Sequence, residues 1–512
     1  MRIIARKKIK KKAPLFAALT LFLLSFLLSG CTFRVGLPER ENASGNGNEN
    51  VSEDETGSLS APDTTVETTA QPEKPDGADA SREDYFAALP SADYGGREFL
   101  IVTTDEQFVE SESESGIIGK YLYRRNRAIE EKFNIKIKVL SAGDAEIQLG
   151  LQAQSADAPY ADLLYAPMEA NATYAGRGLL MNLYSVPFFR YDAPYAEPEA
   201  QRDLTVSDTA YSIYGDAAFD QRAAWCVFYN KSLLSSLGYD PASLVKGGGF
   251  TWDMLLLTAE EAVSDLDGNE RMSASADRFG YSAAMNTTSL CKAAFASFGK
   301  HYFTRDEDGL YAMDYDISDT DDYVSILRRL CVSESALYPS RNPGNDALAA
   351  FNEGRLAYFM GPLTYAATLA YSDVDWGILP MPVRFAGETY KSLVDPSAAC
   401  GYSVPYGVRD SDLCGRVLSA IYAYEASYGE ETVKNAWTYY YLRDNTSAAM
   451  LSEITKNRVY DIAYTFGAGF PDFSIASYEL LSSVMENDVN FSYLYAQNLS
   501  PFSAFMLKQF TN

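Results

Sequence analysis

The chain has 512 residues, of which 47% are hydrophobic and 13% aromatic, and its formal net charge is −26 at pH 7. A surface this acidic repels polyanions, so nucleic acid is excluded as a partner. The single histidine, His301, restricts Ser-His-Asp or Cys-His catalysis to one position and excludes histidine-rich zinc sites.

The N-terminal segment has the pattern of an export signal. A basic start precedes an apolar run over residues 13–28, which ends at Leu28-Ser29-Gly30-Cys31. This pattern predicts a signal peptide over residues 1–30. The last four residues resemble the lipobox of bacterial lipoproteins. The resemblance implies that Cys31 is lipidated, for example palmitoylated, and is the first residue of the mature protein. The lipid would hold the protein at the outer face of the cell membrane. An uncleaved membrane-spanning anchor is the alternative.

A polar segment follows the predicted lipid attachment site. Residues 39–84 consist mostly of Asn, Ser, Gly, Thr, Glu, Asp and Pro and contain almost no large apolar side chains. Such a segment cannot bury enough surface to offset the entropy of ordering, so residues 31–84 are predicted to form a disordered acidic spacer. The remaining 85–512 exceed one ordinary core and predict two domains.

The first part of this body alternates predicted strands and helices. Strands are predicted at residues 98–103, 134–139 and 161–166, where buried or alternating apolar residues lie between turn signals. Helices are predicted at 118–133 and 147–154, from apolar residues at helical spacing. The order strand, helix, strand, helix, strand predicts an α/β fold with a parallel sheet.

Neither cysteines nor acidic clusters predict a metal site. The five cysteines after Cys31 are widely spaced, and we expect small buried side chains whose disulfide state the sequence leaves open: Cys226, Cys291, Cys331, Cys400 and Cys414. Residues 265–270 begin like a calcium loop. However, Glu270 and Ala276 stand where an EF-hand has Gly and Glu, so we expect a turn.

Several segments resemble one family in order and spacing. The most specific is residues 225–231, which ends in Tyr229-Asn230-Lys231, and Thr251-Trp252-Asp253 follows it. Further matching segments are residues 127–135, 161–165, 178–183, 351–359 and 376–382. Together they resemble the extracellular solute-binding proteins of ABC importers, in the sugar-type, maltose-binding-protein-like class (family 1).

The resemblance implies a fold and a way of binding. The fold would be the two-lobed, type II periplasmic-binding-protein-like α/β fold, with lobes joined by crossing hinge strands. Lobe 1 would comprise residues 85–224 and 346–401, and lobe 2 residues 225–345 and 402–512. Such a protein is a monomer without cofactor or catalysis. It captures a polar solute, usually a sugar, and delivers it to the permease subunits of the importer.

Aromatic faces and polar groups suit a sugar, which presents apolar patches and many hydroxyls. Where predicted strands reach the cleft or the hinge, the candidate ligand contacts are Trp225, Glu169, Tyr165, Tyr365 and Tyr402. Each tyrosine has packing as its alternative role, since the chain has 37 of them. Trp252 and Trp376 are expected to anchor a helix and a strand to the core.

Two other functions remain open from the sequence. One is a ligand-sensing lipoprotein that reports to a membrane kinase. The other is a surface glycoside hydrolase, because paired Asp or Glu residues need no histidine. The sequence names neither the solute nor the importer.

Overall fold

The chain divides into a unit over Met1–Pro72 and a second over Glu73–Asn512. The computed structural model describes residues of the second unit only, namely 83–105, 108, 117–155, 159–196, 198–205, 209–301, 304–305, 311–312, 317–337, 343–429, 441–442 and 444–467. The predicted signal peptide, Cys31 and residues 31–82 of the spacer lie outside this range. In the part described, no helix is both long and apolar enough to cross a bilayer.

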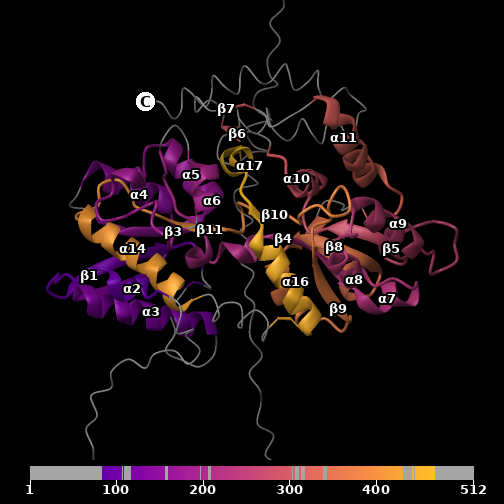
Figure 1. Cartoon of the computed structure of the whole chain (residues 1–512), viewed down its shortest axis with the longest axis horizontal. Helices are drawn as coiled ribbons and strands as arrows, with labels where there is room; N and C mark the ends of the chain where they lie inside the picture. Colours follow the sequence, from indigo (N-terminus) through magenta and orange to yellow (C-terminus); the bar gives the residue numbers. More distant parts are fainter. Residues whose placement is uncertain are drawn as a thin grey trace, which may run out of the picture. The chain divides into compact units, whose positions relative to one another are not determined.

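The first sheet has four strands in the order β11-β3-β1-β2. Figure 1 labels β11, β3 and β1 of this sheet. β1 (Arg97–Thr103) pairs in parallel with β2 (Ile135–Ser141) and with β3 (Leu163–Pro167). β11 (Cys400–Ser403) comes from late in the chain and lies antiparallel to β3. The three strands and the parallel pairing predicted from the sequence are confirmed.

Helices connect these strands as the sequence predicts. α3 (Ile117–Phe133) joins β1 to β2, and α4 (Ala145–Gln154) joins β2 to β3. β2 alternates buried and exposed residues over its first half, as expected for an edge strand with one face on the core. α5 (Met168–Gly176) then begins directly after β3.

The second sheet has the order β5-β8-β4-β9. β4 (Trp225–Asn230) lies antiparallel to β8 (Leu356–Pro362) and β9 (Trp376–Pro380), whereas β5 (Phe279–Ala283) is parallel to β8. Every residue of these four strands is buried, as in a sheet covered on both faces. Packed against the sheet are α7 (Lys231–Ser236), α8 (Pro241–Lys246), α9 (Trp252–Ala262), α12 (Pro343–Asn352) and α16 (Asn445–Lys456).

The chain crosses between the two sheets at residues 223–224 and again at residues 394–395. Backbone hydrogen bonds hold these crossing segments side by side. Ala224 bridges to Val394, the Asp395 amide donates to the Ala223 carbonyl at 2.9 Å, and the Leu363 amide donates to the Ala224 carbonyl at 2.9 Å. A short parallel pair, β10 (Ser392–Leu393) and β12 (Arg458–Val459), continues this region. The two-part α/β fold with crossing strands is therefore confirmed.

The remaining elements lie around these sheets or at the crossings. The helices are α2 (Tyr85–Ala88), α6 (Pro198–Leu204), α10 (Thr287–Ser297), α11 (Ile317–Val332), α13 (Tyr365–Leu369), α14 (Ser411–Tyr428) and α17 (Ile462–Gly467). The 3-10 turns among the described residues are η1 (Leu183–Ser185), η2 (Asp216–Ala218) and η3 (Asp220–Ala223). β6 (Thr304–Arg305) and β7 (Tyr311–Ala312) form an antiparallel pair.

The late segments are distributed over the sheets differently from the expectation. Residues 346–401, expected in lobe 1, supply β8 and β9 to the second sheet. α14, within the stretch expected in lobe 2, packs against α2 and α3 beside the first sheet (Figure 1). The physical reason is long-range pairing: Ala336 bridges to Tyr281 of β5, so the chain stays with the second sheet and returns only after Asp395.

Candidate functional site

Several loops that follow strand ends converge near the crossing segments. In open α/β sheets, ligands bind outside the carboxyl ends of the strands, where successive loops diverge. β3 is followed by the first turn of α5, which carries Glu169. β5 is followed by α10 with Lys292, and β8 by α13, which begins at Tyr365. Both sheets thus contribute a polar side chain to one region.

Asp395 is the centre of this region. It is fully buried, and its Oδ2 accepts hydrogen bonds from Trp225 Nε1 and from the Tyr464 hydroxyl, each at 3.0 Å. Oδ1 of Asp395 accepts hydrogen bonds from the Ser397 amide at 2.9 Å and from the Ser397 hydroxyl at 2.6 Å. A buried carboxylate needs such partners to offset its lost hydration. Asp395 therefore joins β4, α17 and the segment that leads back to β11.

Glu169 lies next to Asp395 and is half-buried. Hydrogen bonds from the Met168 amide to the Ala399 carbonyl (2.8 Å) and from the Glu169 amide to the Pro396 carbonyl (3.3 Å) hold its backbone. Burial raises the pKa of Glu169 above its ordinary value of 4.5, the negative charge of Asp395 raises it further, and Lys292 opposes both. No described residue donates a hydrogen bond to this carboxylate, so it can accept one from a ligand.

Aromatic side chains complete the region. Tyr365 is half-buried, its ring lies edge-on to Phe359 at 5.2 Å between centroids, and no described residue bonds to its hydroxyl. Burial and then the charge of Asp395 raise its pKa. The Lys292 ammonium lies 3.9 Å from the centroid of the Tyr464 ring, a cation–π contact. We call this group the Asp395 cluster: Glu169, Trp225, Lys292, Tyr365, Asp395 and Tyr464.

Three of the five ligand contacts predicted from the sequence belong to the Asp395 cluster: Glu169, Trp225 and Tyr365. The Trp225 side chain has no solvent exposure and its indole N–H is bound to Asp395, so this group is already occupied within the protein. The polar groups of Glu169 and Tyr365 remain available.

Tyr165 and Tyr402 come together in a different place. They face each other across β3 and β11 and are both fully buried. The Tyr165 hydroxyl donates to the Ala218 carbonyl at 2.7 Å, and its ring stacks on Phe108 at 3.8 Å. The Tyr402 hydroxyl accepts from Nη1 of buried Arg125 at 3.1 Å. Both hydroxyls are thus already hydrogen-bonded within the core of the first sheet.

The sequence analysis missed Lys292, Asp395 and Tyr464. No motif marks them, because they lie 69 or more residues apart along the chain. α10 packs against β10, and α17 packs against α5, which is what brings these residues together. The one local signal for Asp395 was an acidic residue directly after the apolar pair Leu393 and Val394.

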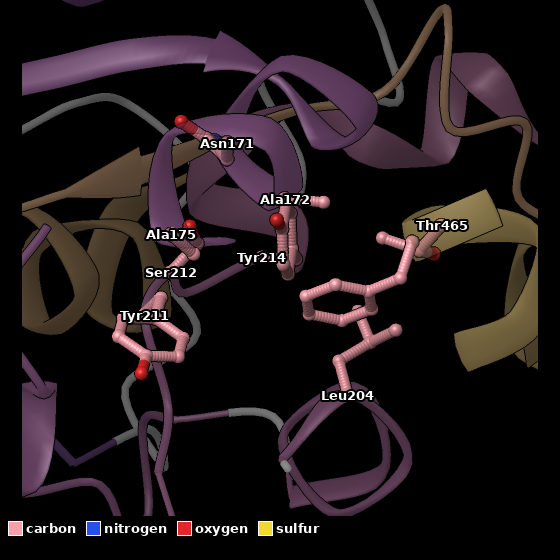
Figure 2. A pocket seen from close by; sticks show the side chains of 9 residues that line it. Asn171, Ala172, Ala175, Leu204, Tyr211, Ser212, Tyr214 and Thr465 are labelled. Carbon is pink, nitrogen blue, oxygen red and sulfur yellow. The ribbon is translucent and has the colours of Figure 1, made fainter. Parts of the chain in front are cut away.

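A narrow pocket lies beside this region, between α5, residues 211–214 and α17 (Figure 2). The pocket has room for roughly one water molecule. It is lined by Asn171, Ala172, Ala175, Leu204, Tyr211, Ser212, Tyr214, Thr465 and Phe466. This pocket is too small for a sugar, so we do not assign the ligand to it.

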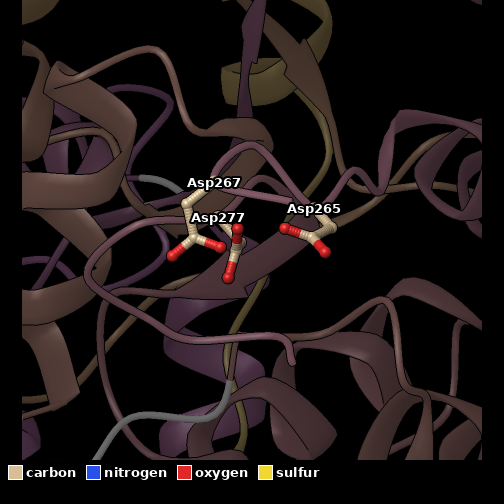
Figure 3. Close-up of side chains that lie close together, drawn as sticks. All are labelled: Asp265, Asp267 and Asp277. Atoms are coloured by element: carbon tan, nitrogen blue, oxygen red, sulfur yellow. The ribbon is translucent and has the colours of Figure 1, made fainter. Parts of the chain in front are cut away.

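The acidic turn predicted at residues 265–270 also has a defined geometry. Asp265, Asp267 and Asp277 place one carboxylate oxygen each within 4.8 Å of one another (Figure 3). Backbone amides occupy these carboxylates: Asp265 accepts from Gly268 at 2.7 Å, and buried Asp277 accepts from Leu266 at 2.9 Å. These bonds are those of a turn, as the sequence predicts.

Comparisons with known proteins place the chain in a family. Residues 126–413, more than half of the chain, match the model of the bacterial extracellular solute-binding proteins. No curated protein matches the sequence.

Two similar solved structures have TM-scores of 0.49. One is the GacH receptor of Streptomyces glaucescens, solved unliganded and with acarbose, at 14% identity over 81% of this chain and 99% of that one. The other is the maltose/maltodextrin-binding domain MalE of Bdellovibrio bacteriovorus, bound to maltotriose, at 15% identity over 80% and 100%. On the family match, this chain belongs to the bacterial extracellular solute-binding proteins, a family of exported binding proteins.

Proposed function

We propose that this protein is a lipid-anchored receptor that captures a carbohydrate or similar polar solute and delivers it to an ABC importer. One observation carries the choice of site: Glu169 and Tyr365 present polar groups to which no described residue bonds, at the starts of helices α5 and α13, which follow strands of the two different sheets. Membership of the extracellular solute-binding family supports the role in capture.

The chemistry of the site favours a neutral, hydroxylated ligand. The Glu169 carboxylate can accept hydrogen bonds from hydroxyl groups, and the Tyr365 hydroxyl can donate or accept one. Lys292 balances the charge of Glu169, while the charge of Asp395 is satisfied by its four donors. Sites for small ligands typically combine a small number of oriented polar groups with aromatic rings.

Capture would proceed by closure about the crossing segments. Glu169 is attached to the first sheet through β3, and Tyr365 to the second through β8. A ligand that contacts both would favour the arrangement in which the two approach, and this is the state that the permease subunits recognise. In this proposal the receptor acts as a monomer, without a cofactor and without catalysis.

Anchoring rests on the N-terminal sequence. Lipid on Cys31 would hold the protein at the outer face of the cell membrane, and the polar segment 31–84 would separate the binding body from the lipid. Neither part lies among the described residues, except for the last two of the spacer.

The test is a thermal-unfolding screen of the full chain in detergent against mono- and oligosaccharides. A sugar that binds the native state at a hundredfold excess over Kd stabilises it by about 2.7 kcal/mol. We expect a selective rise in Tm with one sugar class and no breakdown of that sugar by chromatography. Saccharide release would instead indicate a glycoside hydrolase. The absence of any rise would contradict a carbohydrate ligand and favour another solute or a sensing role.

A further inference from the structure

Two of the five described cysteines lie against each other. The Sγ atoms of Cys291 and Cys331 are 3.3 Å apart, although the residues are 40 positions apart in the sequence. Cys291 lies in α10 and is fully buried, whereas Cys331 lies in the last turn of α11 and is 9% exposed. No such contact joins the other three described cysteines; Cys414, for example, donates to the Asp162 carbonyl at 3.3 Å.

Packing between the two helices holds this pair in place. α10 packs directly against α11. The Tyr323 ring of α11 lies 4.9 Å from the Phe298 ring and 6.3 Å from the Phe295 ring at the end of α10. The contact between the cysteines therefore lies within a packed pair of helices.

We propose that Cys291 and Cys331 form a disulfide in the exported protein. The two sulfur atoms need to approach by only about 1.2 Å to reach the usual bond length of roughly 2.05 Å. Disulfides persist in the oxidising surroundings of exported proteins. The bond itself does not depend on which solute the protein binds, or on whether it delivers that solute to an importer.

The oxidant is an external disulfide, either a small molecule or a thiol oxidoreductase. One cysteine thiolate attacks the external disulfide to form a mixed disulfide and releases the first external thiolate. The second cysteine thiolate then attacks the mixed disulfide, forms the Cys291–Cys331 bond and releases the second external thiolate. Two electrons thus pass to the external disulfide, and the two cysteine protons end on its two thiols.

The position of the bond gives it a consequence for binding. Lys292, which contacts Tyr464 in the Asp395 cluster, directly follows Cys291. A covalent link between α10 and α11 would limit the movement of the helix that carries this ammonium. If the Asp395 cluster binds the solute, the disulfide also preorganises one side of the binding site.

Peptide mapping tests the bond directly. The full chain is isolated without reductant, unfolded in the presence of an alkylating agent, digested, and analysed by mass spectrometry. We expect a linked peptide pair that contains Cys291 and Cys331, with alkylated Cys226, Cys400 and Cys414. Alkylation of both Cys291 and Cys331, even after incubation of the native protein with oxidised glutathione, would overturn the proposal. So would a link from either one to a different cysteine.

Thermal unfolding with and without reductant provides the second measurement. Reduction should lower the Tm of the wild-type protein by roughly 5 °C, because the link restrains the unfolded chain. The double variant C291S/C331S should show no response to reductant. The control C226S, which replaces a buried cysteine elsewhere, should respond like the wild type. An identical response in C291S/C331S and wild type would contradict the assignment, and no response in the wild type would contradict a stabilising bond.

Discussion

The indole Nε1 of Trp225 donates a 3.0 Å hydrogen bond to Oδ2 of Asp395, and this bond links the first residue of β4 to the segment that returns the chain to the first sheet. Both side chains are fully buried. The link lies among the crossing segments, and the residues around it come from both sheets. Loss of this hydrogen bond should therefore lower the stability of the protein more than it weakens ligand binding.

Trp225→Phe should lower the free energy of unfolding by about 1–3 kcal/mol, because it leaves the buried Asp395 carboxylate with one donor fewer. Urea unfolding followed by circular dichroism measures this change. The matched control is Trp252→Phe, where the lost bond goes from Nε1 to the neutral Ser297 hydroxyl at 3.0 Å. A smaller loss is expected there, and equal losses would argue against a special role for the charged acceptor.

Glu169→Gln should weaken ligand binding and change the pH dependence of stability. Since burial and Asp395 raise the pKa of Glu169 above 4.5, the folded state binds more protons than the unfolded state in that range. The free energy of unfolding of the wild type therefore falls as pH rises from 4.5 through the raised pKa.

The variant lacks this fall. We expect Glu169→Gln to be more stable than wild type at pH 7 and equal to it below pH 4.5, by urea unfolding at a series of pH values. A variant that is less stable at pH 7 would show that the carboxylate makes a favourable contact within the protein.

Tyr365→Phe removes a hydroxyl that bonds to no described residue. We expect little change in stability but a loss of ligand affinity of about tenfold, corresponding to one hydrogen bond of about 1.4 kcal/mol. Isothermal titration calorimetry with the sugar found in the thermal screen measures it. In the control Tyr358→Phe, the lost bond is to the Thr258 hydroxyl at 2.8 Å inside the core. The Tyr358→Phe variant should lose stability and keep its affinity. Unchanged affinity in Tyr365→Phe would remove Tyr365 from the site.

Tyr402→Phe tests the alternative role of the buried tyrosines. The variant leaves Nη1 of buried Arg125 without its hydroxyl acceptor, so we expect a loss of about 1–3 kcal/mol in stability and unchanged ligand affinity. Tyr165→Phe, which removes the bond to the Ala218 carbonyl, should behave in the same way. Weaker binding at unchanged stability would instead support both residues as ligand contacts, as the sequence predicts.

Cys31→Ser should release the protein from the membrane, because the predicted lipid attachment requires the thiol. Fractionation of cells followed by immunoblotting measures the change. Cys414→Ser, a substitution of a buried cysteine in α14, is the control that should remain with the membrane. Continued membrane association of Cys31→Ser would favour an uncleaved anchor.

Local sequence patterns were sufficient to predict the strands β1, β2 and β3 and the helices α3 and α4. The alternation in residues 134–139 predicted β2, and the apolar spacing in 118–133 predicted α3, because both patterns reflect one buried face of a single element. Trp252 and Trp376 were correctly predicted as anchors: both are buried, with their N–H groups bound to Ser297 and to the Leu369 carbonyl.

The sequence by itself determined the element types, the α/β class, the family resemblance and two polar residues of the candidate site, Glu169 and Tyr365. Only the tertiary structure decided that β8 and β9 join the second sheet, and that Lys292, Asp395 and Tyr464 meet beside Glu169. The physical reason is range. Periodicity records which face of one element is buried, whereas sheet partners and the Asp395 cluster depend on contacts between residues far apart in the chain, which no local pattern encodes.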